Sequence, residues 1–271
     1  MRLQLELVRL AFRRHLAYRA AALAGLATNF FFGLLRAAVM VALYGERQEM
    51  QGVTLEAAIT YTGLSQAVIG PLAMFSWLEV TRAVHSGEVA SDLLKPMGYY
   101  GFWLARDVGR ALATFLWRSV TILLAYVFMF RLLAPPGAKF VLPESLAQWL
   151  AVVLACCLAW WVSFSWRFLA NVSAFWSPDA RGIVRLAFIF SWFASGFIMP
   201  LRFYPDWVVE LCMLTPFPHT VNSIVEIYLG LLSGPEILAT LGLQLAWGLA
   251  LCGACLLALR AGVRRLVILG G

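Results

Sequence analysis

The chain has 271 residues, of which 62% are hydrophobic and only 13% are charged, and its mean hydropathy is +0.81. Soluble domains carry about 25% charged and about 45–50% apolar residues, so this composition excludes an ordinary soluble protein and predicts an integral membrane protein. The net charge of +7 does not point to nucleic acid, because basic residues also collect beside membrane spans. The five cysteines show no metal-ligand spacing and imply no structural disulfide.

Residues 1–19 are predicted to form an amphipathic helix at the membrane surface. Arg9 and Arg13 lie four residues apart on a polar stripe, and Leu5 lies on an apolar side. Such a helix would rest at the cytoplasmic interface with its arginines reaching lipid headgroups. The apolar run that follows, 20–45, is too long for a signal peptide, so it is expected to be the first span.

Six apolar stretches are long enough, or nearly so, to cross a bilayer at about 1.5 Å per residue. The fold class is therefore an all-α integral membrane protein with six transmembrane helices, and residues 1–271 make one transmembrane domain. The fifth stretch is short, so Arg185 is expected to snorkel at its cytoplasmic end. The expected spans cover about 20–45, 57–82, 107–133, 145–168, 184–201 and 236–259.

The basic residues orient these spans. With both termini in the cytoplasm, fifteen basic residues fall on the inner side and four on the outer side, and the positive-inside rule favours this topology. Arg36 and Arg118 remain inside spans, where an arginine costs about 2.5–3.5 kcal/mol on insertion scales. No acidic residue lies at an obviously matching depth. Each of these arginines is expected to line a polar substrate path, to meet a second subunit or to snorkel.

A short polar stretch interrupts the apolar sequence in the cytoplasmic loop 84–106. Val89 and Leu93 fall four residues apart, as do Glu88 and Asp92, so a short helix here would have one apolar and one acidic face. Two interpretations stay open, a solvated loop and a helix that docks a soluble partner. The residues of that docking helix are Ser86 as its N-cap, Gly87, Glu88, Val89, Asp92, Leu93 and Lys95.

Residues 202–235, before the last span, do not have the composition of a linker. Asp206 is a candidate N-cap for a helix through Leu214, and 220–232 could form a second helix. The segment is either a pair of short helices that dips back into the outer leaflet or a loop that caps the outer surface. Its distinguishing residues are Pro200, Pro205, Asp206, Trp207, Pro216, Phe217 and Pro218.

The sequence lacks the common catalytic and nucleotide-binding motifs. It contains no P-loop, no G-x-S-x-G elbow and no H-E-x-x-H, so neither ATP hydrolysis nor a cofactor is expected in this chain. His15, His85 and His219 are scattered and suggest no metal site. A stand-alone channel or secondary transporter would favour acidic residues or broken helices at mid-membrane, and neither is evident. A membrane-embedded enzyme is the least favoured alternative.

Several short stretches, in order along the six-span frame, resemble permease subunits of type-2 ABC exporters. The resemblance extends over the whole chain and is closest to the subgroup whose permeases occur as unlike pairs. One departure is His85, where arginine or lysine is expected. The matching stretches are Ser86-Gly87-Glu88, Asp92-Leu93-Leu94-Lys95-Pro96, Gly196, Met199-Pro200-Leu201, Phe203-Tyr204-Pro205-Asp206-Trp207, Pro216-Phe217-Pro218, Leu229-Gly230 and Gly270-Gly271.

This resemblance implies an N-terminal elbow helix, a cytoplasmic coupling helix after the second span and an outer re-entrant hairpin before the sixth. It also implies an export permease without catalysis of its own, in the plasma (inner) membrane. The expected partners are two copies of an ABC ATP-binding subunit, which would hold ATP and Mg²⁺, and a second permease. That permease is expected to be an unlike paralogue or a second copy of this chain.

Overall fold

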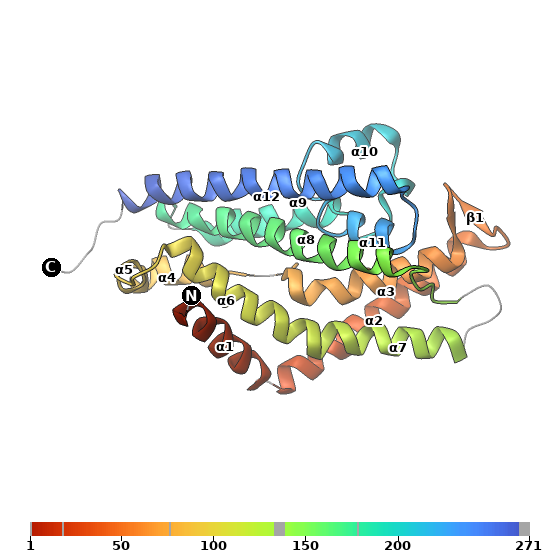
Figure 1. Ribbon diagram of the computed structural model, residues 1–271, viewed down its shortest axis with the longest axis horizontal. Coiled ribbons are helices and arrows are strands. Elements are labelled where there is room, and N and C mark those ends of the chain that lie inside the picture. The colour runs from red at the N-terminus through yellow and green to blue at the C-terminus, as the bar shows by residue number, and fades with distance from the viewer. Residues whose placement is uncertain (1, 18, 76, 133–138, 178, 266–271) are drawn as a thin grey trace.

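The structure is a computed structural model that describes residues 2–17, 19–75, 77–132, 139–177 and 179–265. It is an elongated bundle in which most helices follow the long axis (Figure 1). Gly270 and Gly271 lie outside the described residues. The helices are α1 (Arg2–Ala17), α2 (Arg19–Tyr44), α3 (Leu55–Leu72), α4 (Glu79–His85), α5 (Glu88–Leu93), α6 (Tyr99–Thr114), α7 (Val120–Leu132), α8 (Leu146–Val172), α9 (Ala180–Ala194), α10 (Asp206–Met213), α11 (Asn222–Tyr228) and α12 (Gly234–Val263).

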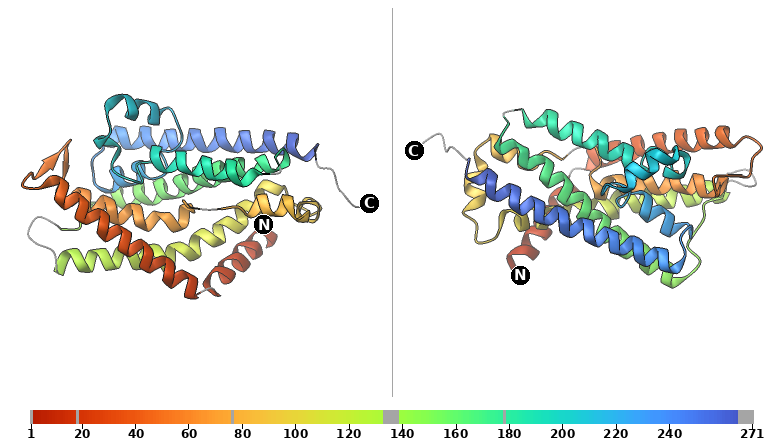
Figure 2. Two further views of the ribbon diagram at one scale, coloured as in Figure 1. Left: turned by 180° about the vertical axis from the view of Figure 1, so that it is seen from behind. Right: turned by 90° about the horizontal axis from the view of Figure 1, so that it is seen from above.

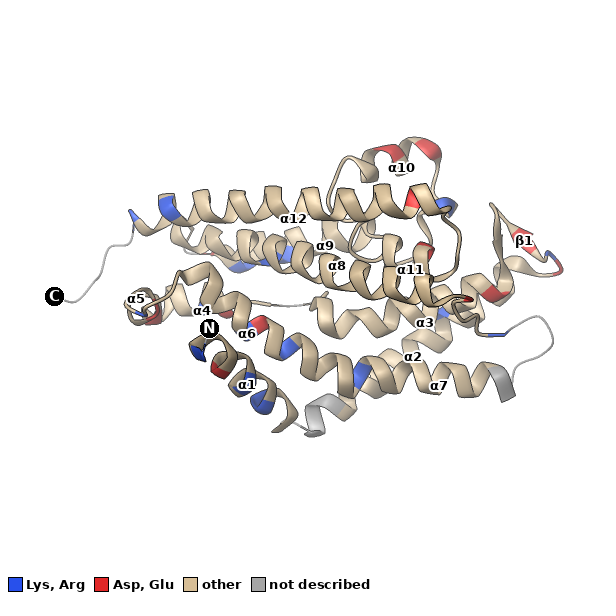
Figure 3. Cartoon of the chain, in the orientation of Figure 1, with Lys and Arg blue, Asp and Glu red and all other residues tan. Residues whose placement is uncertain are grey.

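The chain is an all-α membrane protein by the length and composition of its helices. Four helical stretches of the described chain are long and apolar enough to cross a membrane: Leu23–Tyr44, Tyr99–Phe130, Leu146–Phe175 and Gly234–Val263. Long parts of α8 and α12 carry no charged residue (Figure 3). Helices α3 and α9, which coincide with the second and fifth predicted spans, have only 18 and 15 residues. The count of six spans therefore stays a prediction.

The second predicted span, 57–82, is not one helix. Pro71 lies inside the last turn of α3, and the helix ends at Leu72, with Ala73 in the left-handed region at φ 48°. Residues 73–75 and 77–78 are not helical, and the chain becomes helical again at Glu79 in α4. Figure 1 shows this break between α3 and α4. A proline inside a helix removes one hydrogen bond and crowds the preceding turn, so Pro71 weakens α3 just before its end.

The third predicted span also differs. Helix α6 begins at Tyr99, so part of the segment predicted as the loop 84–106 is helical. The charges at Arg106 and Asp107 suggested a membrane boundary there, but Arg106 pairs with Glu79 and Asp107 pairs with two arginines. Paired charges do not force a helix to end. Residue 133, the predicted end of this span, lies outside the described residues.

A π-helical turn, Phe115–Ser119, joins α6 to α7 without ending the helix. Such a turn adds a residue to the helical repeat and re-aims the side chains around it, and it is frequent at functional sites. Here the turn contains Arg118. This arginine donates to the carbonyl of Gly25 at 2.9 Å and to Asn29 Oδ1 at 2.6 Å, both on α2.

A two-stranded hairpin between α2 and α3 is the one feature of the described chain outside the predicted all-helical design. Strands β1 (Glu49–Met50) and β2 (Val53–Thr54) pair antiparallel. The connecting residues Gln51 and Gly52 have φ values of 50° and 74°. Two successive positive φ values match the tight turn whose twist suits a hairpin. The side chain of Thr54 then caps the start of α3 by accepting from Ala57 N.

The first helix packs closely against α6. A Cβ placed on Gly109 would lie 2.2 Å from the carbonyl oxygen of Val8 and 2.8 Å from the Ala11 Cβ, so only glycine allows this approach. The predicted amphipathic helix of residues 1–19 corresponds to α1. The contact between α1 and Gly109 sets how α1 lies against α6. The edge formed by α1 and α7 lies opposite α12 (Figure 1, Figure 2).

The segment before the last helix contains two short helices, as predicted, with shorter bounds. Helix α10 starts at Asp206 itself, and Pro205 holds the N-cap position without a side-chain hydrogen bond, so Asp206 is not the N-cap. Helix α11 covers only part of the predicted 220–232. Tyr61 of α3 donates to the carbonyl of Gly196 at 2.8 Å and also to Asn222 Oδ1 at 3.2 Å, which ties this segment to the bundle.

Candidate functional site

Helices α4 and α5 form the tip of the bundle at the end where α12 terminates (Figure 1). Val89 is fully buried and anchors α5 from inside. Gly87 begins the helix in the left-handed region at φ 78°, with no side-chain cap. The expectation that Ser86 caps the helix is therefore wrong, because its hydroxyl faces the carbonyl of Ala83 instead.

The predicted acidic face of α5 is only half present. Glu88 is exposed, whereas Asp92 is only 7% exposed and accepts a 2.5 Å hydrogen bond from Lys95. The pairing neutralises Asp92, so its charge does not face outward. The most prominent apolar group at the tip is Leu94, just after α5, which is 87% exposed. Leu93, which was predicted to lie on the apolar face, is half-buried.

The tip is tied to the bundle through Asn171 of α8. Its Oδ1 accepts from Thr81 N at 3.1 Å and from Thr81 Oγ1 at 2.8 Å, and its Nδ2 donates to the carbonyl of Trp77 at 2.8 Å. Asn171 is fully buried. An ion pair of 3.3 Å between Arg106 and Glu79 joins α6 to the start of α4. The tip therefore follows α8 and α6 more directly than α3, from which it is separated by the break.

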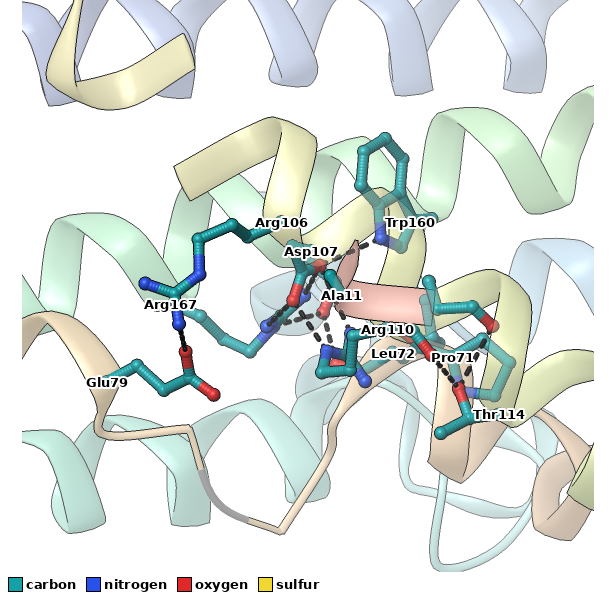
Figure 4. Close-up of polar contacts among 12 residues, drawn as sticks. Ala11, Pro71, Leu72, Glu79, Arg106, Asp107, Arg110, Thr114, Trp160 and Arg167 are labelled. Atoms are coloured by element: carbon teal, nitrogen blue, oxygen red, sulfur yellow. Dashed lines mark hydrogen bonds and ion pairs between the residues drawn. The ribbon is translucent and has the colours of Figure 1, made fainter. Parts of the chain in front are cut away.

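A buried charge cluster that the sequence did not reveal lies where α3 breaks (Figure 4). Asp107 of α6 accepts from Arg110 Nε at 2.6 Å and from Arg167 Nη2 at 2.8 Å. Trp160 Nε1 donates to the same carboxylate at 2.9 Å. The Asp107 side chain is fully buried and that of Arg167 nearly so. Buried charges of this kind survive only when they are paired and hydrogen-bonded.

The same cluster satisfies the broken end of α3. Arg110 donates to the carbonyls of Gly70 at 2.8 Å and Pro71 at 2.7 Å, and Ser163 donates to that of Leu72 at 2.9 Å. The last carbonyls of a helix have no partner within it, and a cation there also interacts favourably with the helix dipole. The arginine therefore holds the break in place of the missing helical turn.

Arg36 and Arg118, the two arginines predicted within spans, lie in different places. Arg36 of α2 donates to the carbonyls of Phe197 and Ile198 after α9, and its guanidinium lies 5.0 Å from the centre of the Phe197 ring. Arg118 bonds back to α2, as described above. The structure does not bring the two side chains into one group of contacts. Each carries buried nitrogens with no partner in the described chain, Nε and Nη1 of Arg36 and Nε of Arg118.

The prolines and aromatics of the predicted outer hairpin divide into buried and exposed members. Phe217 is buried and contacts Trp166 of α8 edge-on, at 5.0 Å between ring centres. Trp207 is 66% exposed. Pro200 precedes a single 3-10 turn, Leu201–Phe203. Within the described part of the chain, no group of three or more His, Cys, Asp or Glu residues could hold a metal ion.

Comparison of the sequence with known protein families identifies one family that matches most of the chain. The model of the ABC-2 family transporter proteins matches residues 30–270, which covers the described chain from the middle of α2 through α12. No curated protein and no solved structure matches the chain. The family consists of membrane components of ABC transporters, which work with an ATP-binding subunit and are not themselves catalytic. The chain therefore belongs to the ABC-2 family of transporter proteins and is the permease component of an ABC transporter.

Proposed function

We propose that this permease is the transmembrane subunit of an ATP-driven exporter and that its ATP-binding partner docks on α4 and α5. The observation that carries the proposal is the tip formed by these helices. It presents Glu88 and Leu94 outward, while buried Val89 and the Asn171 hydrogen bonds fix it to the bundle. A fixed protrusion can transmit displacement, whereas a solvated loop would absorb it.

In this arrangement the partner holds ATP and Mg²⁺, and this chain supplies docking and the substrate path. Closure of the ATP-binding subunits would displace α5. Asn171 and the Arg106–Glu79 pair would then carry the displacement into α8 and α6. The partner-facing residues are the exposed members of the predicted coupling helix, Ser86, Gly87 and Glu88, together with Leu94.

The proposal extends to the assembly. Two ATP-binding subunits and a second permease, an unlike paralogue or a second copy, would complete the transporter in the plasma (inner) membrane, with both termini cytoplasmic and α10–α11 dipping into the outer leaflet. Arg36 and Arg118 would lie along a polar substrate path; their buried nitrogens have no partner in the described chain, and a solute would supply one when the surrounding helices separate. Exchange of either arginine for Gln should alter transport and leave the amount of protein in the membrane unchanged. If transport and membrane expression fall equally, the arginine has a folding role instead.

The docking proposal is tested by co-purification of the ATP-binding subunit with tip variants. Leu94→Asp removes an apolar contact worth about 1.5–3 kcal/mol if it becomes buried, so capture of the ATP-binding subunit should fall at least tenfold. Glu88→Lys should also weaken capture. Glu210→Lys, at an exposed position on α10, is the matched control and should not change it.

Two results would overturn the proposal. One is unchanged capture and unchanged stimulation of ATP hydrolysis in both tip variants. The other is transport by this chain alone in liposomes, without a partner or nucleotide, which would favour a stand-alone transporter.

A further inference from the structure

A cavity of about 450 Å³ lies between α1 and the first turns of α6. Its volume is within the range of about 300–1,000 Å³ that small-molecule sites occupy. The close approach of α1 to Gly109 fixes the distance between the two helices, so the cavity is built into their crossing. Most of its lining is apolar, with Leu3, Leu7 and Leu10 on α1 facing Trp77 and Phe102.

Cations gather at one part of this lining. The Lys95 ammonium lies 3.8 Å from the centre of the Phe102 ring, and the Arg106 guanidinium lies 5.4 Å from the same ring. Arg14 of α1 also lines the cavity and forms no ion pair within the described chain. Arg106 contacts Glu79 through Nη2 at 3.3 Å, which leaves other donors among its five N–H groups available.

The acids that line the cavity do not cancel this charge. Asp107 is already neutralised by Arg110 and Arg167, and Glu79 is opposed by Arg106. Lys95 is paired with Asp92, so Arg14 supplies the positive excess beside an apolar floor. A site that combines the two favours an amphiphile with an anionic head, whereas a nucleotide or free phosphate would leave the apolar floor unfilled.

We propose that this cavity binds one membrane phospholipid with an acidic headgroup. The phosphate end lies among Arg14, Lys95 and Arg106, and an acyl chain lies along the leucines of α1. The exposed apolar residues Leu3 and Leu10 on the same helix place the opening where acyl chains are present. Basic pockets between membrane helices bind acidic headgroups in this way. The lipid would lie between α1 and α6, beside the tip. The docking proposal does not require this lipid.

The experiment compares two adjacent charge reversals. Arg14→Glu changes a cavity residue, and Arg13→Glu changes its exposed neighbour on the same helix, which does not line the cavity. The purified full chain in neutral detergent is titrated with phosphatidylglycerol and, separately, with phosphatidylcholine. Native mass spectrometry gives the dissociation constant of the first lipid bound.

We expect phosphatidylglycerol to bind more tightly than phosphatidylcholine. Arg14→Glu should weaken the first phosphatidylglycerol about 30-fold, since each basic charge contributes about fivefold and a reversal changes the charge by two units. Arg13→Glu should weaken it less than threefold. Equal weakening by both variants would show only general attraction to a basic helix, and equal affinity for the two lipids in the native chain would show a non-selective apolar surface; either result overturns the proposal. Retention of native helical circular dichroism by both variants keeps the comparison valid.

Discussion

The most direct consequence of the buried cluster concerns Asp107. The change Asp107→Asn keeps the size of the side chain and removes its charge, so Arg110 and Arg167 lose the anion that compensates both of them. The amide also brings its own N–H groups against guanidinium donors. Because the carboxylate is fully buried and accepts from both arginines and from Trp160, water cannot replace it.

Breaking a buried pair by removing one partner costs about 3–5 kcal/mol. We therefore expect Asp107→Asn to lower the free energy of unfolding by about 3 kcal/mol or more. The matched control is Glu79→Gln, which breaks the pair with Arg106, where both side chains are about one-third exposed. A partly exposed pair contributes at most about 1 kcal/mol, so the control should change stability little.

The assay is reversible unfolding in mixed micelles of increasing SDS fraction, followed by tryptophan fluorescence and circular dichroism. A second variant sharpens the result. Asp107→Leu combined with Arg167→Met replaces two of the three charged groups by apolar ones of similar size, and should recover part of the loss because only Arg110 then stays buried without its anion. Equal, small effects of Asp107→Asn and Glu79→Gln would refute the reasoning, since they would mean that water reaches the cluster.

Further predictions follow from single contacts. Gly109→Leu should separate α1 from α6, because its side chain would overlap the backbone of α1, and a protease site placed before residue 19 should then be cut faster. Asn171→Leu should lower stability by about 2 kcal/mol, because Thr81 and the Trp77 carbonyl lose their partner; SDS unfolding measures it, and no change would contradict the link. Tyr61→Phe should lower the free energy of unfolding by about 1 kcal/mol, because the hydroxyl loses its hydrogen bonds to Gly196 and to Asn222 of α11; SDS unfolding measures it. The neighbouring change Phe197→Leu leaves both hydrogen bonds in place and should not reproduce the loss of the contact between α3 and α11.

Hydropathy predicted the long helices well because the bilayer imposes length and apolarity on each of them independently. It could not show that α3 breaks and is then completed by other helices. Pro71 was visible as a signal for the break, but the partner that makes the break tolerable, Arg110, is 39 residues away in the chain. The sequence could therefore indicate where the helix weakens and not what holds its end.

The charged residues were harder to place for the same reason. Asp107 and Arg110 are three residues apart, a spacing that places them on one helix face, yet the third member, Arg167, is 60 residues away. Without it, the sequence did not show that the two charges are buried, and the third span was predicted to begin only at Asp107. At the tip, Asp92 has the right spacing for an acidic face with Glu88, but Lys95 folds back onto it. Local spacing identifies faces, and only the packed structure identifies partners.

The break in α3 and the cluster that holds it have one common consequence for movement in this permease. A continuous second helix would carry displacement of the tip along its own axis toward the hairpin of β1 and β2. Here the tip is linked through Asn171 to α8 and through Glu79 to α6, while α3 is held from α6 by Arg110. If the ATP-binding partner displaces α5 as proposed, the displacement would reach α6 and α8 first, and α3 would respond through the arginine. Arg110, with Ser163, consequently lies where the proposed movement of the tip would pass to α3.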